Sequence, residues 1–169
     1  MNHETYIKRC IELAKKATGK TYPNPLVGAV IVHNDVIIGE GFHQKAGEAH
    51  AEINAINSVK NPKLLQESTI YVSLEPCAHF GKTPPCSLKL KEIGFKKVVI
   101  GAMDSHDKVN GKGKKILMDA GIETFSGILE EDCRDLNKRF FTFHEKKRPY
   151  LILKWAESKD GFKIGRAHV

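Results

Sequence analysis

The residues in this 169-residue chain that are best suited to chemistry are a histidine, a glutamate and two cysteines. His50 and Glu52 are separated by one residue, and Cys77 and Cys86 follow downstream. One imidazole and two thiolates can bind a zinc ion, and a site with three protein ligands leaves a fourth position open for water. Glu52 is close enough to His50 to reach that water without ligating the metal. The sequence therefore predicts a catalytic zinc site with ligands His50, Cys77 and Cys86 and with Glu52 as its catalytic residue.

The loop between the two cysteines is the unusual part of this pattern. A His-x-Glu followed by Pro-Cys and a second cysteine is typical of zinc-dependent deaminases, whose usual signature places the cysteines closer together. Here eight residues, Ala78 to Pro85, separate them. His79 and Lys82 belong to this loop, and a metal ion would hold the loop at both ends. We therefore expect both side chains to lie near the metal.

Local patterns predict which elements carry the metal ligands. Apolar residues at helical spacing predict a helix at 49–59, which opens with His50. The β-branched run Thr69–Leu74 predicts a strand that delivers Cys77 at its end. The second cysteine opens a predicted helix at 86–93, which stops before a glycine. Two helix starts and one strand end would thus meet at the metal.

The rest of the chain alternates helices and strands after an opening hairpin. The remaining expected elements are a helix at 5–18, strands at 27–32, 36–42 and 97–102, a helix at 114–120, a strand at 122–125 and one helix at 130–146. This order predicts an α/β fold, namely a three-layer α/β/α sandwich around a central mixed sheet of about five strands.

Three further segments could contact a ligand. Asn24 lies between two prolines, and a turn residue and a fixed amide aimed at a ligand are equally supported there. Asp104 and His106 follow the predicted strand 97–102, where open α/β sheets place their ligand crevice. The Gly-Lys-Gly run at 111–113 precedes a helix and could bind phosphate, although it lacks the full phosphate-loop pattern and a flexible helix start is favoured.

Composition limits the classes of partner. The formal net charge of +7, from 27 basic and 20 acidic residues, suggests an anionic partner such as a phosphorylated metabolite or nucleic acid. The lysines are scattered, which favours a basic surface over a nucleic-acid groove. No apolar run approaches the ~20 residues of a membrane span, and the N-terminus lacks a signal-peptide pattern. We expect a cytoplasmic protein with no membrane partner, in which Cys10 and Cys133 are buried free thiols.

Three stretches carry a family resemblance: His50-Ala51-Glu52, the run from Leu74 to Cys86, and the run from Pro23 to Gly28. From about residue 3 to 145, the sequence resembles the deaminase domain of the bacterial riboflavin-biosynthesis bifunctional deaminase/reductase. The inter-cysteine run is the specific element, since His-Ala-Glu alone would indicate only the wider cytidine-deaminase-like superfamily.

The resemblance implies a cytidine-deaminase-like fold with one Zn²⁺ per chain. It also implies the deamination of 2,5-diamino-6-ribosylamino-4(3H)-pyrimidinone 5′-phosphate to 5-amino-6-ribosylamino-2,4(1H,3H)-pyrimidinedione 5′-phosphate, with release of ammonia. The partner would then be a small phosphorylated pyrimidine and not nucleic acid, and a homo-oligomer is possible. The substrate contacts that the resemblance implies are Asn24, His43, His79, Lys82, Asp104 and His106. His106 lies where the family usually has asparagine, and histidine can still donate a hydrogen bond.

The C-terminal residues resemble a second domain. The run Arg148 to Ala156 is similar to the first strand of the family's reductase domain. We therefore expect a zinc-dependent deaminase domain at 1–146 and the truncated start of a reductase-like domain at 147–169. NADPH would serve only the missing reductase domain of a bifunctional parent.

Two other functions remain as alternatives. A polynucleotide (tRNA) or free nucleoside deaminase would share the metal motif and the basic balance. The long inter-cysteine loop disfavours a polynucleotide substrate, and so does the absence of an aromatic and basic stripe for stacking a strand. A non-catalytic zinc domain would require a fourth protein ligand, and none has suitable spacing.

Overall fold

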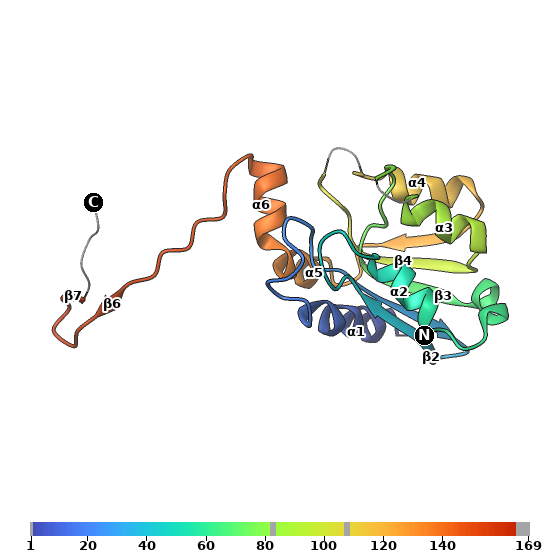
Figure 1. The fold of residues 1–169 in the computed structure, drawn as a ribbon, viewed down its shortest axis with the longest axis horizontal. Coiled ribbons are helices and arrows are strands. Elements are labelled where there is room, and N and C mark those ends of the chain that lie inside the picture. The colour runs from blue at the N-terminus through green and yellow to red at the C-terminus, as the bar shows by residue number, and fades with distance from the viewer. Residues whose placement is uncertain (1, 82–83, 107–108, 165–169) are drawn as a thin grey trace.

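The computed structural model describes residues 2–81, 84–106 and 109–164. Its centre is a five-stranded sheet in the order β2-β1-β3-β4-β5 (Figure 1). β1 (Gly28–His33) pairs antiparallel with β2 (Val36–Phe42) and with β3 (Thr69–Leu74). β4 (Lys97–Ala102) pairs parallel with β3 and with β5 (Glu123–Ser126). The predicted mixed sheet is confirmed.

Helices cover both faces of this sheet. They are α1 (His3–Lys15), α2 (Ala51–Ser58), α3 (Cys86–Ile93), α4 (Lys112–Asp119), α5 (Glu130–Leu136) and α6 (Lys138–Lys146), with a 3₁₀ helix η1 (Pro62–Glu67). Side chains alternate between the two faces along a strand. On β1, Ala29 and Ile31 pack in a buried cluster with α2, α3 and α4, whereas Val30 and Val32 pack with α1, α5 and α6. The three-layer α/β/α sandwich is confirmed.

Several element ends follow from local chemistry. The turn between β1 and β2 consists of Asn34 and Asp35, both with positive φ (48° and 61°), as a two-residue hairpin turn of type I′ requires. α3 ends at Gly94, which adopts the left-handed conformation with φ 74°. Cys10 and Cys133 are fully buried free thiols, as expected.

A close contact between β2 and α2 fixes where α2 lies on the sheet. A Cβ atom added to Gly41 on β2 would lie 2.2 Å from the backbone nitrogen of Ala55 and 2.6 Å from the carbonyl oxygen of Ala51. Only glycine therefore allows α2 to lie directly against this strand. The contact sets the position of the start of α2, where the N-cap His50 and Glu52 in the first turn are candidate site residues.

The prediction of one helix at 130–146 was wrong, because α5 and α6 are separated at Asn137. Asn137 has φ −116° and ψ 26°, outside the helical range. Its side chain is buried and makes two hydrogen bonds with the backbone of Leu26, one to the N–H and one to the carbonyl, each 2.8 Å long. These bonds join the α5–α6 junction to the segment before β1, which carries Asn24.

After α6 the chain runs away from the sandwich as an extended tail (Figure 1). The tail contains a short hairpin of β6 (Ala156–Glu157) and β7 (Lys163–Ile164). Its apolar side chains are exposed, with Leu153 at 83% and Trp155 at 62%. None of the helices in the described part of the chain combines the length and apolarity of a membrane span.

Candidate active site

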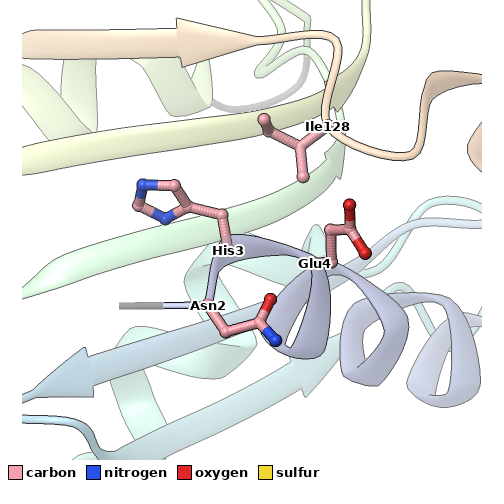
Figure 2. A pocket seen from close by; sticks show the side chains of 4 residues that line it. All are labelled: Asn2, His3, Glu4 and Ile128. Carbon is pink, nitrogen blue, oxygen red and sulfur yellow. The ribbon is translucent and has the colours of Figure 1, made fainter.

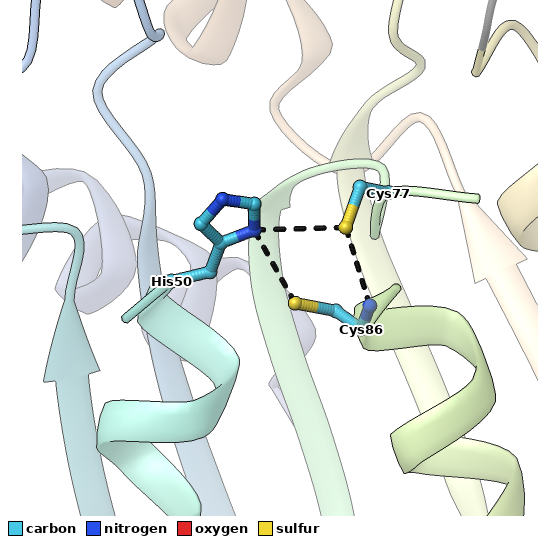
Figure 3. Close-up of side chains that lie close together, drawn as sticks. All are labelled: His50, Cys77 and Cys86. Carbon is cyan, nitrogen blue, oxygen red and sulfur yellow. Dashed lines mark hydrogen bonds between the residues drawn. The ribbon is translucent and has the colours of Figure 1, made fainter. Parts of the chain in front are cut away.

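Three potential metal ligands meet where α2, β3 and α3 come together. His50 is the N-cap of α2, Cys77 follows the end of β3, and Cys86 is the first residue of α3. His50 Nδ1 lies 3.6 Å from Cys77 Sγ and 3.4 Å from Cys86 Sγ. Figure 3 shows the three side chains pointing toward one another. The structure thus brings together the three residues that the sequence singles out.

These separations fit a tetrahedral zinc ion. Typical Zn–S and Zn–N bonds at tetrahedral angles place the nitrogen and sulfur ligands about 3.6 Å apart. All three ligand atoms lie within 4.8 Å of one another, and they form the one such group of three or more among the described residues. A set of one imidazole and two thiols without a fourth protein ligand suits a catalytic zinc site with an open position.

Hydrogen bonds within the group shift the pKa values of the two cysteines in opposite directions. The hydrogen bond from the Cys86 thiol, together with a weaker one from His50, lowers the pKa of Cys77. The backbone N–H of Cys86 also donates to Cys77 Sγ at 3.2 Å. Donating to Cys77 in turn raises the pKa of Cys86. Cys77 is thus the sulfur that loses its proton more readily, and a bound metal cation would favour the thiolate form of both.

Glu52 lies in the first turn of α2, beside the ligand cluster. The residue is 3% exposed, and its carboxyl group lies beside the Cys86 thiol. Burial, reinforced by the negative charge of Cys77, raises the pKa of Glu52 to about 7. A carboxyl group with this pKa can take up and release a proton near neutral pH, as a general acid–base catalyst must.

Asn24 is oriented by His43. The carbonyl oxygen of Ala49 can only accept a hydrogen bond, so His43 Nδ1, at 3.1 Å, must carry the proton. His43 Nε2 then accepts from Asn24 Nδ2 at 3.1 Å, which turns the amide oxygen of Asn24 away from the ring. His43 is 2% exposed, and its ring centroid lies 5.3 Å from that of His50. His43 is thus placed behind Asn24 as its support, and burial lowers the pKa of His43, which keeps the ring neutral.

Asp104, His106 and His79 are linked by close contacts. Asp104 follows β4, is 7% exposed and accepts a hydrogen bond from the His106 N–H at 2.7 Å. Burial raises the pKa of Asp104 to about 6, and the nearby charges of Glu75 and Cys77 add to this effect. The ring centroids of His79 and His106 lie 6.2 Å apart with nearly parallel planes. Lys82, the remaining predicted contact, lies outside the described residues.

Sequence reasoning missed three polar residues around this site. His144 on α6 lies 4.6 Å from His106 between ring centroids, and nothing in the phenylalanine-rich pattern of α6 indicates this contact. Asn137 holds the segment that carries Asn24. Glu75 follows an entirely buried strand and is itself buried. A carboxylate in that position needs hydrogen-bond partners, and this requirement was the signal that could have identified it.

A pocket at the start of α1 is separate from the candidate metal ligands. It has a volume of about 520 Å³ and is lined by Asn2, His3, Glu4 and Ile128 (Figure 2). These residues belong to the start of α1 and the loop after β5. They do not belong to the group of candidate metal ligands that Figure 3 shows.

Comparison with known proteins agrees with this site. Residues 1–102 match the family described as cytidine and deoxycytidylate deaminase zinc-binding region. The matched residues include all three candidate metal ligands and Glu52. The chain therefore belongs to the cytidine and deoxycytidylate deaminase zinc-binding family.

Two relatives show which members of this family the chain is similar to. The riboflavin biosynthesis protein RibD of Aquifex aeolicus is 46% identical over 158 residues, which cover 94% of this chain and 44% of that protein. The solved diaminohydroxyphosphoribosylaminopyrimidine deaminase/5-amino-6-(5-phosphoribosylamino)uracil reductase of Thermotoga maritima superposes with a TM-score of 0.87 at 46% identity, over 94% of this chain and 45% of that one. The predicted resemblance to the riboflavin-biosynthesis deaminase/reductases is confirmed. The chain spans less than half the length of these relatives.

A more distant solved structure supports the fold alone. The Rib2 deaminase of Aspergillus oryzae is 22% identical and superposes with a TM-score of 0.65, over 85% of this chain and 94% of that one. The cytidine-deaminase-like fold implied by the sequence is confirmed.

Proposed function

We propose that this chain catalyses the zinc-dependent hydrolytic deamination of 2,5-diamino-6-ribosylamino-4(3H)-pyrimidinone 5′-phosphate, with release of ammonia. One observation carries the proposal: His50, Cys77 and Cys86 have zinc-ligand spacing with Glu52 buried beside them. The identity of 46% to RibD over 94% of the chain supports this choice of substrate. We further propose that residues 1–146 form a deaminase domain and that residues 147–169 are the start of a reductase-like domain. In a longer parent protein the complete reductase domain would use NADPH. That parent would be cytoplasmic.

The chain's own residues would divide the chemistry as follows. Zinc held by the three ligands would supply an activated water for hydrolysis near neutral pH. Two thiolates and one neutral imidazole make the ligand set formally neutral with Zn²⁺, so a separate proton acceptor is needed. Glu52 would accept the first proton of the water as general base and deliver it to the ring nitrogen. It would then take the second proton, from the hydroxyl group added to the ring carbon, and deliver it as general acid to the amine, which leaves as ammonia when the C–N bond breaks.

The surrounding residues would orient the substrate. The amide oxygen of Asn24, turned away from His43, is an acceptor for an N–H or O–H group of the substrate. Asp104 would accept from the base or the ribose, and His79 and His106 would contact the ribose phosphate end. These groups favour a small phosphorylated pyrimidine as the substrate over nucleic acid. The protein would act alone or as a homo-oligomer.

Ammonia release tests the proposed function. Zinc-loaded protein is incubated separately with the diaminopyrimidinone phosphate, with cytidine and with tRNA. A site whose buried polar groups fit one substrate rejects analogues strongly, so we expect release from the diaminopyrimidinone phosphate to be faster by at least about a hundredfold. Comparable release from cytidine or tRNA would instead support the nucleoside or polynucleotide alternative.

Lys82→Ala tests how the substrate phosphate is bound. Lys82 lies four residues before Cys86 in the sequence and is the cation that we expect at the phosphate. Loss of a charged hydrogen bond costs about 1.5–3 kcal/mol, so kcat/KM for the phosphorylated substrate should fall roughly ten- to a hundredfold. Turnover of the dephosphorylated substrate should change little. The matched control is Lys91→Ala on the exposed face of α3, and equal losses on both substrates would show that Lys82 only shapes the loop.

A further inference from the structure

Glu75 is a buried carboxylate without an assigned role. It lies between the end of β3 and Cys77 and is 3% exposed. Its Oε2 accepts hydrogen bonds from the N–H groups of Asp104 (3.2 Å) and Gly111 (2.9 Å), and its Oε1 accepts from the N–H of Lys114 (3.0 Å). Burying a polar side chain is costly unless it is hydrogen-bonded, and three N–H donors satisfy both oxygens of this one. Glu75 thus joins the end of β3 to both ends of the segment between β4 and α4.

Two glycines at the start of α4 allow its backbone to approach this carboxylate. Gly111, the N-cap of α4, has φ 83°, which favours glycine. A Cβ atom on Gly113 would lie 2.0 Å from the carbonyl oxygen of Pro76, so only glycine allows α4 to approach the end of β3. The first amides of α4 therefore bind an anion supplied by the chain itself. This favours close packing as the role of the Gly-Lys-Gly run, and it argues against a phosphate there.

We propose that Glu75 is a positioning residue that sets the place of the substrate-contacting residues Asp104 and His106 relative to the metal ligands. Cys77 lies two residues after Glu75, and Asp104 donates its own N–H to the Glu75 carboxylate. Asp104 in turn accepts from the His106 N–H. One side chain thus links the metal side of the site to its substrate side. This proposal rests on the proposed deaminase function and gives Glu75 no contact with the substrate.

Glu75→Gln tests this role with little change in side-chain size. Glutamine has one acceptor oxygen where glutamate has two, so its NH₂ group faces at least one backbone N–H and leaves that donor without a partner. We expect KM for the diaminopyrimidinone phosphate to rise by about tenfold or more, whereas kcat stays within about threefold and zinc stays at one per chain. Glu131→Gln on the exposed start of α5 is the matched control and should leave KM unchanged.

Amide hydrogen exchange supplies a second readout that does not depend on turnover. Exchange at Asp104, Gly111 and Lys114 should be slow in the wild-type protein and about tenfold faster or more in Glu75→Gln, while Val72 in the core strand stays protected. Faster exchange with an unchanged KM would overturn the proposal and leave Glu75 a purely structural role. Loss of zinc would also overturn it, by making Glu75 part of the metal site.

The two proposals fail in different ways. A wild-type protein that releases no ammonia contradicts the proposed function, whereas an active wild type with an unchanged KM in Glu75→Gln contradicts only the positioning role. Should Glu75→Gln not fold, Glu75→Asp takes its place. It keeps the charge but is one methylene shorter, and the same rise in KM is expected.

Discussion

Glu52→Gln should leave zinc bound and reduce kcat for deamination by about 10²–10⁴-fold, the usual contribution of general acid–base catalysis. The amide has the shape of the carboxylate but cannot accept the proton that hydrolysis releases. The carboxyl is buried next to Cys86, so no bulk solvent replaces it as proton acceptor. Ammonia release and metal content measured on the same preparation check this result. A loss of less than tenfold would contradict the assigned role of Glu52.

The same substitution should stabilise the metal-free protein at high pH. The ordinary pKa of this carboxyl is 4.5, and burial raises it to about 7 in the folded state. Between these values the folded state holds a proton that the unfolded state has released, so the stability of the wild type falls as pH rises from 4.5 to 7. Above pH 7 the full penalty applies, roughly 3 kcal/mol for a shift of this size. Glutamine has no charge to bury and escapes this penalty.

Denaturant unfolding of the two metal-free proteins at low and high pH measures this difference. Zinc must be absent because a bound cation would favour the charged carboxylate. Glu52→Gln should be more stable than the wild type at pH 8, and the advantage should shrink toward pH 4.5, where the wild-type carboxyl is protonated in the folded state. An advantage that is equal at both pH values would show that burial of charge is not its cause.

Cys86→Ala should abolish zinc binding and deamination together. The substitution leaves His50 and Cys77 as two ligands where the structure has three. Two ligands cannot hold zinc in competition with a chelator, and the activated water is lost with the metal. Metal analysis after dialysis should find well below one zinc per chain, and ammonia release should fall to background.

Cys133→Ala is the matched control for this loss. Cys133 is a fully buried free thiol on α5 that packs in the cluster on the α1 side of the sheet. The control variant should retain one zinc per chain, because it removes a thiol that is not a ligand. Full zinc occupancy in Cys86→Ala would exclude Cys86 from the metal site.

The sequence by itself determined the candidate metal ligands and most of the elements that position them. His50, Cys77 and Cys86 are recognisable because ligand chemistry restricts residue type and because each follows a local signal for a helix start or a strand end. The strands at 69–74 and 97–102 were predicted with the bounds that the structure has, because alternation and β-branched composition act within a few residues. The Asn34-Asp35 turn is equally local.

The tertiary structure alone decided how the site is held together. The break at Asn137 depends on Leu26, 111 residues away, and the role of Glu75 depends on amides 29 to 39 residues downstream. His43 supports Asn24 only because Ala49 fixes which ring nitrogen carries the proton. Residue spacing cannot predict such pairs, because a buried polar group must be hydrogen-bonded but its partner is whichever group the packed chain brings within reach.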